Sequence, residues 1–154
     1  MNAATVLLID TNILVYRVDS RFPDKQQIST EHMRAGIEAR NAYIAHQSVI
    51  EFVAATTRGG PERRLLDVAE AAREAEELMT QFPIIYADAA VVRTALRGAA
   101  AYGMSWFDAH LWAYAEVNGI TGLLSEDFEH GRLYGTVRVT NPFAVADQTA
   151  GDSS

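Results

Sequence analysis

Four acidic side chains stand where carboxylates could assemble a metal-dependent phosphate chemistry: Asp10, Glu51, Asp108 and Asp127. Two of them follow short apolar runs typical of buried strands, and two lie in the first turns of expected helices. In a parallel α/β sheet, such positions can all fall at one edge. Carboxylates without lysine, histidine or cysteine at comparable positions suit a hard cation, Mg²⁺ or Mn²⁺. Beside a phosphate, such an ion polarises an oxygen, generates hydroxide and stabilises the leaving oxygen.

Each of the two acids at strand ends also has a structural explanation. Asp10 ends the apolar run of residues 6–9 and can cap the helix that follows it. Asp127, three residues after the apolar pair Leu123 and Leu124, is by itself best explained as a surface loop residue. The grouping of the acids is therefore more informative than any one of them.

The two acids on helices differ in how well a capping role explains them. Ser48 and Glu51 form a formal capping box, and for Glu51 alone we favour that explanation. Against it, the small residues Ala54 and Ala55 leave room for a ligand one turn further on. Asp108 follows Ser105 at the same spacing, but its helix is apolar nearly all round, so we expect it to be deeply buried. A buried carboxylate needs a cation or several hydrogen bonds.

Short apolar segments alternate with longer helical ones, which predicts an α/β fold with a mostly parallel sheet covered on both faces. We expect strands at residues 5–9, 42–45, 83–86, 121–124 and 137–140. We expect helices at residues 12–18, 26–40, 48–58, 67–81, 88–101 and 105–118, with loops at 20–25 and 125–135.

The 154 residues predict one domain, residues 1–146, followed by a small polar tail, 147–154, that we expect to be disordered. Lysine and arginine total 13 against 20 acids, a net charge of -7, which argues against a protein coated in positive charge. It does not exclude a nuclease, because a bound cation offsets the acids of its site. With no cysteine, no signal peptide and no apolar run of membrane-spanning length, we expect a cytoplasmic protein without a membrane partner.

The order and spacing of the acidic segments resemble the four motifs of PIN-domain nucleases, most of all the VapC-type ribonuclease toxins of bacterial toxin–antitoxin systems. The segments that carry the resemblance are Asp10-Thr11-Asn12, Glu51, Ser105-Trp106-Phe107-Asp108-Ala109 and Ser125-Glu126-Asp127. The segment 125–131, together with Asn141-Pro142-Phe143, is similar to one bacterial branch of that family. The match extends over residues 5–143, nearly the whole chain.

The resemblance implies a PIN-like α/β/α sandwich in which the four acids bind one or two Mg²⁺ or Mn²⁺ ions. It implies an endoribonuclease that hydrolyses RNA phosphodiester bonds and leaves a 5′-phosphate and a 3′-hydroxyl. Asn12 and Ser125 match polar positions that orient the acids or the water. The resemblance also implies a homodimer and a cognate VapB-like antitoxin whose C-terminal segment occupies the groove.

Three other functions compete with a toxin. One is a PIN-type nuclease of RNA processing that is not a toxin. Another is a haloacid-dehalogenase-like phosphohydrolase with Asp10 as nucleophile, but position 12 is Asn and the only lysine, Lys25, lies in an expected loop. The last is a binding module whose acids only cap helices, each cap contributing about 1 kcal/mol.

Basic and aromatic residues give weaker indications. Arg58, Arg63 and Arg64 flank the Gly59-Gly60-Pro61 loop and suit either an RNA backbone or a solvated loop. The four histidines lack metal-ligand spacing; His110 is expected to point away from Asp108, and His130 to be a loop residue. Glu126 and Glu129 are expected to be solvated. Four aromatic residues are expected in the core rather than stacked on bases: Trp106, Phe107, Trp112 and Tyr114.

Overall fold

The first strand, β1 (Leu7–Ile9), lies in the middle of the sheet, parallel to β2 (Ala42–Ala45) on one side and β4 (Gly122–Leu124) on the other. The computed structural model describes residues 5–144. The predicted disordered tail, 147–154, lies outside the described residues.

Within β1, Leu8 and Ile9 are both almost completely buried, as expected for a strand covered on both faces.

The sheet has the order β3-β2-β1-β4-β6-β5, and it is parallel except for β5. Its remaining strands are β3 (Ile84–Ile85), β5 (Leu133–Tyr134) and β6 (Val137–Thr140). The prediction of a mostly parallel sheet is confirmed. The expected loop 125–135 is wrong at its end, because β5 pairs with β6 through a turn at Gly135. A strand of two residues is too short to leave an alternating pattern.

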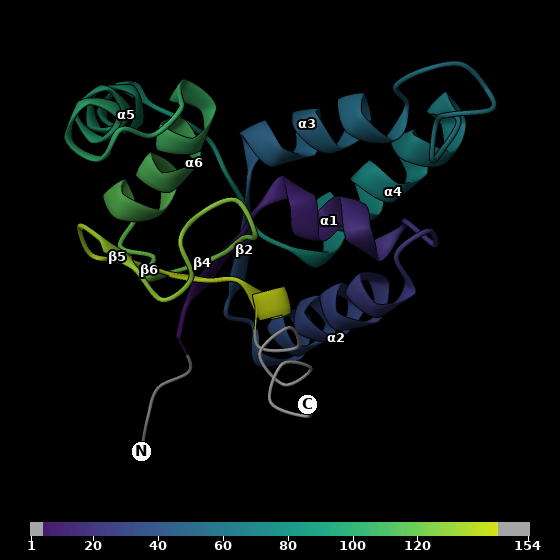
Figure 1. Cartoon of the computed structure of the whole chain (residues 1–154), viewed down its shortest axis with the longest axis horizontal. Helices are drawn as coiled ribbons and strands as arrows, with labels where there is room; N and C mark the ends of the chain where they lie inside the picture. Colours follow the sequence, from purple (N-terminus) through teal and green to yellow (C-terminus); the bar gives the residue numbers. More distant parts are fainter. Residues whose placement is uncertain (1–4, 145–154) are drawn as a thin grey trace, which may run out of the picture.

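The helices divide between the two faces of the sheet, with the strands between them (Figure 1). One face is covered by α1 (Thr11–Arg17), α2 (Pro23–Ala39), α3 (His46–Thr56) and α4 (Val68–Gln81). The other is covered by α5 (Ala89–Tyr102) and α6 (Trp106–Val117). The expected α/β/α sandwich is therefore confirmed. Among the described residues, no helix is long and apolar enough to cross a membrane.

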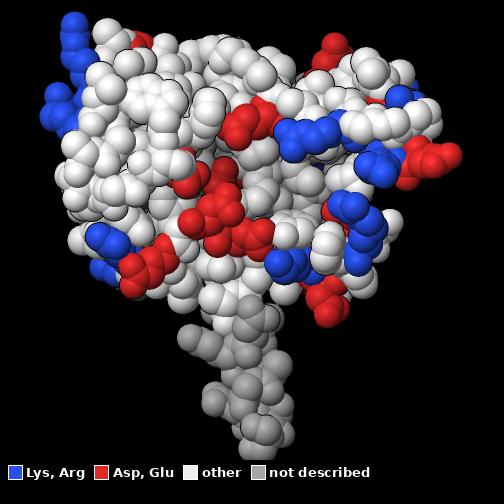
Figure 2. All heavy atoms as spheres, turned by 45° about the horizontal axis from the view of Figure 1, so that its top comes forward, with Lys and Arg blue, Asp and Glu red and all other residues white. Residues whose placement is uncertain are grey.

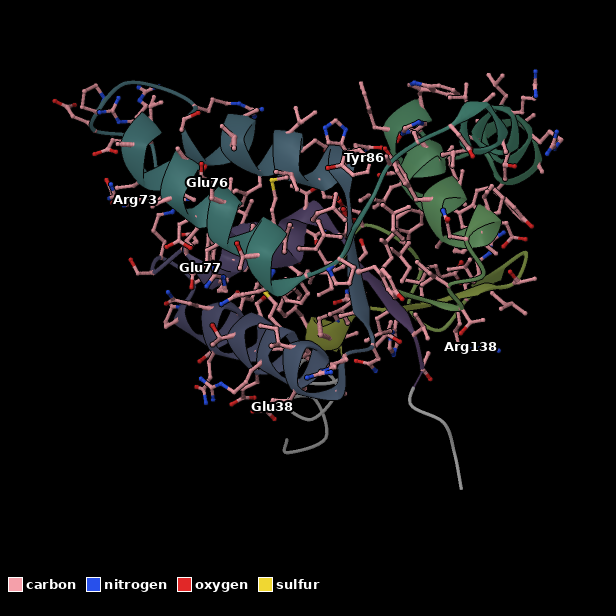
Figure 3. The ribbon with its side chains drawn as sticks, turned by 180° about the vertical axis from the view of Figure 1, so that it is seen from behind. Glu38, Arg73, Glu76, Glu77, Tyr86 and Arg138 are labelled. Carbon is pink, nitrogen blue, oxygen red and sulfur yellow. The ribbon has the colours of Figure 1, made fainter. Side chains whose placement is uncertain are left out.

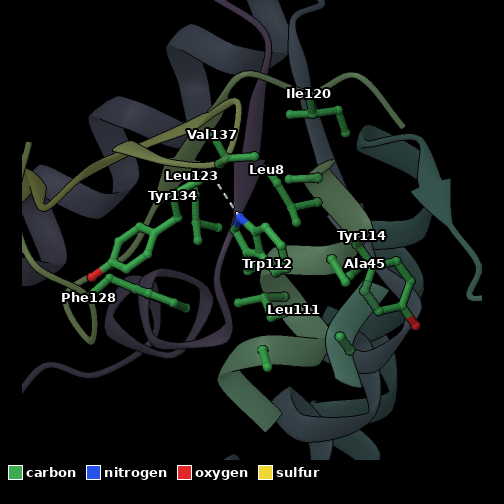
Figure 4. Close-up of a cluster of buried hydrophobic side chains, with 14 of the residues drawn as sticks. Leu8, Ala45, Leu111, Trp112, Tyr114, Ile120, Leu123, Phe128, Tyr134 and Val137 are labelled. Carbon is green, nitrogen blue, oxygen red and sulfur yellow. Dashed lines mark hydrogen bonds between the residues drawn. The ribbon is translucent and has the colours of Figure 1, made fainter. Parts of the chain in front are cut away.

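Trp112 is central to the core between the sheet and α6 (Figure 4). Its indole Nε1 donates a hydrogen bond to the Tyr134 carbonyl oxygen at 3.0 Å. Gly98 of α5 lies directly against the Trp112 ring, where any Cβ would collide with it. Helices α5 and α6 therefore pack closely, and Trp112 and Tyr114 are core residues as predicted.

Trp106 and Phe107 are exposed, at 42% and 67%, so the prediction that they pack in the core is wrong. The buried part of α6 begins at Ala109, and the first turn lies beyond it. Helical spacing predicts a common face but not where along the helix contact with the sheet begins.

Helix ends follow local chemistry. A capping box begins α4, since the side chains of Asp67 and Glu70 bond each other's backbone N–H groups. The outward face of α4 carries charged residues such as Glu76 and Glu77, which Figure 3 shows from behind. Helix α2 starts at Pro23, inside the expected loop 20–25, because proline is favoured in the first turn.

Candidate metal centre

Sheet register brings Asp10 and Ser125 to the same edge. The Asp10 N–H donates to the carbonyl oxygen of Leu124 at 3.0 Å, which extends the pairing of β1 with β4 by one residue. The Ser125 N–H donates in the same way to Thr140, the last residue of β6, at 3.0 Å. Both side chains therefore stand at the carboxyl ends of neighbouring parallel strands, where α/β proteins bind ligands.

The Ser125 hydroxyl links two of the predicted acids. Its O–H donates to Asp10 Oδ2 at 2.6 Å, and its oxygen accepts the backbone N–H of Asp127 at 3.1 Å. The Asn12 amide nitrogen lies 3.3 Å from Asp10 Oδ2 and 3.4 Å from Ser125 Oγ. The structure thus brings Asp10, Asn12, Ser125 and Asp127 together.

Asp10 is a buried carboxylate as well as a helix cap. Its Oδ1 accepts the Thr11 N–H at 2.6 Å at the start of α1, yet the residue is only 6% exposed. The pKa of Asp10 is raised to about 7, mainly by burial and also by the charges of Asp127 and Glu51, against the lowering effect of the hydrogen bonds from Ser125 and Thr11. Near neutral pH this carboxyl holds a proton part of the time, and a cation could take its place.

Glu51 is not part of a capping box, so that prediction is wrong. Helix α3 begins at His46 with Ala45 as its N-cap, and Ser48 lies inside the first turn. The Ser48 Oγ is buried and has no hydrogen-bond partner among the described residues. Glu51 instead lies one turn further on, partly buried, with its charge reaching Asp10.

Gln47 supports Glu51, a contact that the sequence analysis missed. Its Nε2 donates to Glu51 Oε1 at 2.6 Å and contacts the Phe107 carbonyl oxygen at 3.2 Å. Its Oε1 lies 2.6 Å from Nδ1 of His110 on α6. The signal was available, since Gln47 precedes Glu51 by four residues, a spacing at which helical side chains meet. His110, expected to point elsewhere, is connected to the acids through this amide.

Asp108 stands at the beginning of α6, where the Ser105 hydroxyl accepts its backbone N–H at 3.3 Å. It is partly buried rather than deeply buried, because it lies just before the buried stretch of the helix. Burial raises the pKa of Asp108, and the nearby charge of Asp127 raises it as well. Asp127 itself is exposed, and it is the acid whose charge acts on both Asp10 and Asp108.

Acidic side chains gather near the middle of the face shown in Figure 2. Within residues 5–144, however, no group of three or more His, Cys, Asp or Glu side chains converges closely enough to hold an ion directly. The Asn12 Oδ1 is buried without a hydrogen-bond partner in the described part of the chain. The charges of these carboxylates act on one another, and the amide oxygen of Asn12 beside them is free within the described chain. Such a group fits a hard cation that keeps several of its waters.

Glu126 is not solvated, which corrects the prediction for this residue. It accepts a hydrogen bond from the Tyr16 hydroxyl at 2.6 Å and forms an ion pair with Lys25 at 3.0 Å. These contacts hold the loop after β4 against α1 and α2. Lys25, the only lysine of the sequence, pairs with Glu126 and is not among the groups that shift the pKa of Asp10, so the phosphohydrolase alternative lacks a lysine acting on its nucleophile.

The remaining candidates lie outside the acidic group. His130 accepts the Asn141 N–H at its Nδ1, which gives it a structural role in its loop, as expected. Glu129 is exposed, as expected, and its only ion pair within the described chain is with Arg132. Arg58, Arg63 and Arg64 surround the loop that follows α3.

Comparisons with known proteins identify the fold. A family model of the PIN domain matches residues 7–135, a span that contains all four acids. No curated protein sequence matches the chain. A toxin–antitoxin complex from Klebsiella pneumoniae has a similar structure, with 18% identity and a TM-score of 0.63 over 88% of this chain and 97% of that one.

Two further solved structures show the same fold. One is a DNA-bound VapBC complex from Salmonella typhimurium, with 11% identity and a TM-score of 0.67 over 90% of this chain and 98% of that one. The other is VapC20 of Mycobacterium tuberculosis, described as a sarcin-ricin loop cleaving toxin, with 14% identity and a TM-score of 0.57 over 79% of this chain and 89% of that one.

Proposed function

Since this chain belongs to the PIN domain family, we propose that it is a metal-dependent endoribonuclease and the toxin of a type II toxin–antitoxin pair. The observation that carries the proposal is the buried carboxyl of Asp10, whose raised pKa marks a site built for a positive charge. A surface cap would not be desolvated in this way.

Asp10, Glu51, Asp108 and Asp127 would hold one or two Mg²⁺ or Mn²⁺ ions, directly or through water. A bound divalent cation would supply Lewis-acid stabilisation of the charge that develops on a phosphodiester. Ser125 fixes Asp10 and the backbone of Asp127 relative to each other. Asn12 holds Asp10 with its amide nitrogen and offers its amide oxygen to a water or an ion.

The RNA substrate and the antitoxin are proposed from the similar structures, which are toxin–antitoxin complexes and a toxin that cleaves RNA. The partner would be a VapB-like antitoxin, and the site of action the cytoplasm. Arg58, Arg63 and Arg64 could contact the RNA backbone beyond the end of α3. We also propose that residues 1–146 act as one nuclease domain.

A homodimer is proposed from exposed apolar side chains beside α3 and α6. Ile50, 57% exposed, lines one pocket with the exposed Trp106 and Phe107, and Tyr86 is 60% exposed. Tyr86, labelled in Figure 3, packs against the His46 ring at the start of α3. Apolar surface of this kind is typical of a protein–protein contact, and a second copy of the chain would cover it.

The test is cleavage of single-stranded RNA by the purified protein with Mg²⁺ or Mn²⁺. Asp10→Asn and Asp108→Asn should each lower the rate about 10³-fold, since a metal ion contributes several kcal/mol to the transition state. Asp67→Asn, which changes a helix cap of similar chemistry outside the site, should leave the rate unchanged. Undiminished cleavage by both site variants, with native circular dichroism, would rule out the assignment.

A further inference from the structure

We propose that Gln47 is a positioning residue that holds the carboxylate of Glu51 toward the metal centre, and that His110 fixes the Gln47 amide. The inference rests on the proposed function, because it assigns a support to one of the proposed metal ligands. It concerns three side chains on two helices, Gln47 and Glu51 on α3 and His110 on α6.

The orientation of the Gln47 amide follows from its neighbours. Its nitrogen faces the Glu51 carboxylate at 2.6 Å and the Phe107 carbonyl at 3.2 Å, two groups that only accept hydrogen bonds. Turning the amide over would place its oxygen against both acceptors. The amide oxygen must therefore face His110, and Nδ1 of His110 must carry the hydrogen in the 2.6 Å contact.

His110 is itself held in place by aromatic rings of its own helix. Tyr114 meets it edge-on with ring centroids 5.1 Å apart, and Trp106 lies at 6.0 Å on the other turn. The imidazole of His110 therefore lies between these two rings, one helical turn from each. A continuous series of contacts then leads from α6 through His110 and Gln47 to Glu51.

This series does more than join two helices. The contacts of Gln47 to the Phe107 carbonyl and to His110 already link α3 to α6, whereas its shorter contact to Glu51 lies within α3 and joins no helices. Gln47 engages only Oε1 of Glu51, and no described residue donates to Oε2. One oxygen is held and the other is left for a cation. Ligating carboxylates are commonly oriented by such hydrogen bonds.

The experiment measures Mn²⁺ binding to the full chain without RNA by isothermal titration calorimetry. Gln47→Met keeps the length of the side chain and removes its hydrogen bonds, so we expect Mn²⁺ affinity to fall about 10-fold or more. Gln27→Met is the matched control, because Gln27 makes the same contact to Glu31, four residues on, along the exposed side of α2. We expect the control to bind Mn²⁺ as the native protein does.

Two further variants separate positioning from a structural role. In a Glu51→Gln background, Gln47→Met should cause no additional loss of Mn²⁺ affinity, because its effect passes through Glu51. His110→Asn, which keeps a donor near the place of Nδ1, should bind Mn²⁺ like the native protein, whereas His110→Phe should lose affinity as Gln47→Met does.

Three results would overturn the inference. Native Mn²⁺ affinity in Gln47→Met, even with a lower melting temperature, would make Gln47 a purely structural link. An equal loss with and without Glu51 would show that Gln47 acts elsewhere. If the native chain did not bind Mn²⁺, the proposed function would be overturned together with the inference. The first two results, in contrast, would overturn only the role of Gln47.

Discussion

The strand side of the candidate centre and its helix side are built differently. On the strand side, Asp10 and Ser125 are buried at 6% and 0% exposure and are placed by backbone pairing between β1, β4 and β6. On the helix side, Glu51 and Asp108 are partly buried, and Glu51 is held by another side chain.

The difference indicates that the strand side of the centre is rigid and that its helix side can adjust. The position of Asp10 is fixed by the sheet, and burial makes its charge costly, a cost that a bound cation would offset. Glu51 approaches from a helix on a flexible side chain whose placement depends on Gln47. Changes on the strand side should therefore alter stability strongly, while changes on the helix side should mainly alter metal binding.

The largest effect is expected for Asp10→Asn in the absence of metal. The folded pKa of Asp10, about 7, lies above its ordinary 3.8, so the folded state binds the proton more tightly than the unfolded state. The free energy of unfolding therefore falls as pH rises from about 4 to about 7. Asp10→Asn removes this loss and should stabilise the protein at pH 8 by up to about 4 kcal/mol, since one pKa unit is about 1.4 kcal/mol.

Urea unfolding at pH 4 and pH 8 checks this expectation. The gain should nearly vanish at pH 4, where the Asp10 carboxyl is protonated in both states. Glu51→Gln is the matched change on the helix side and should shift the free energy of unfolding at pH 8 by less than about 1 kcal/mol. Equal stabilisation by both variants would erase the contrast between the two sides.

Ser125→Ala should have the next largest effect. The variant removes the donor to Asp10 and the acceptor for the Asp127 N–H inside a buried site, which should cost about 1–3 kcal/mol. Because the Ser125 hydroxyl lowers the pKa of Asp10, its loss should raise that pKa above 7. Carboxyl ¹³C NMR across a pH titration measures the shift, and an unmoved Asp10 resonance would show that this bond is not formed in solution.

The smallest effect is expected at exposed helix caps. Ser105→Ala at the start of α6 and Asp67→Ala at the start of α4 should each cost about 1 kcal/mol in thermal unfolding. Only Ser105→Ala should also change RNA cleavage, because it disturbs the turn that carries Asp108. If both variants cleaved RNA equally well, the first turn of α6 would not be part of the centre.

The fold and the strand side of the centre were predictable because they depend on short-range patterns. An apolar run that ends in Asp10 specifies a buried strand and the sheet edge at which the acid lies. The same logic placed Ser125 after β4, where it bonds both Asp10 and Asp127. Local sequence likewise favours the helix caps that form at Asp67, Asp88 and Ser105.

The helix side was harder to predict because its contacts join segments far apart in the chain. The spacing of Ser48 and Glu51 imitated a capping box, but α3 starts two residues before Ser48, directly after β2. Gln47 and His110, which are in contact, lie 63 residues apart in the sequence, and no local pattern predicts their contact. Likewise, Glu126 finds its partners Tyr16 and Lys25 only through the packing of α1 and α2.

The most direct test of the central claim, that the four acids form one cation site, is thermal unfolding with and without Mn²⁺. At an Mn²⁺ concentration 100-fold above its dissociation constant, mass action should add about 2.7 kcal/mol to the native state, raising its melting temperature by roughly 5–10 °C. Asp67→Asn should show the same rise, and Asp10→Asn should show none. An unchanged melting temperature for the native protein, or an equal rise in Asp10→Asn, would contradict the claim.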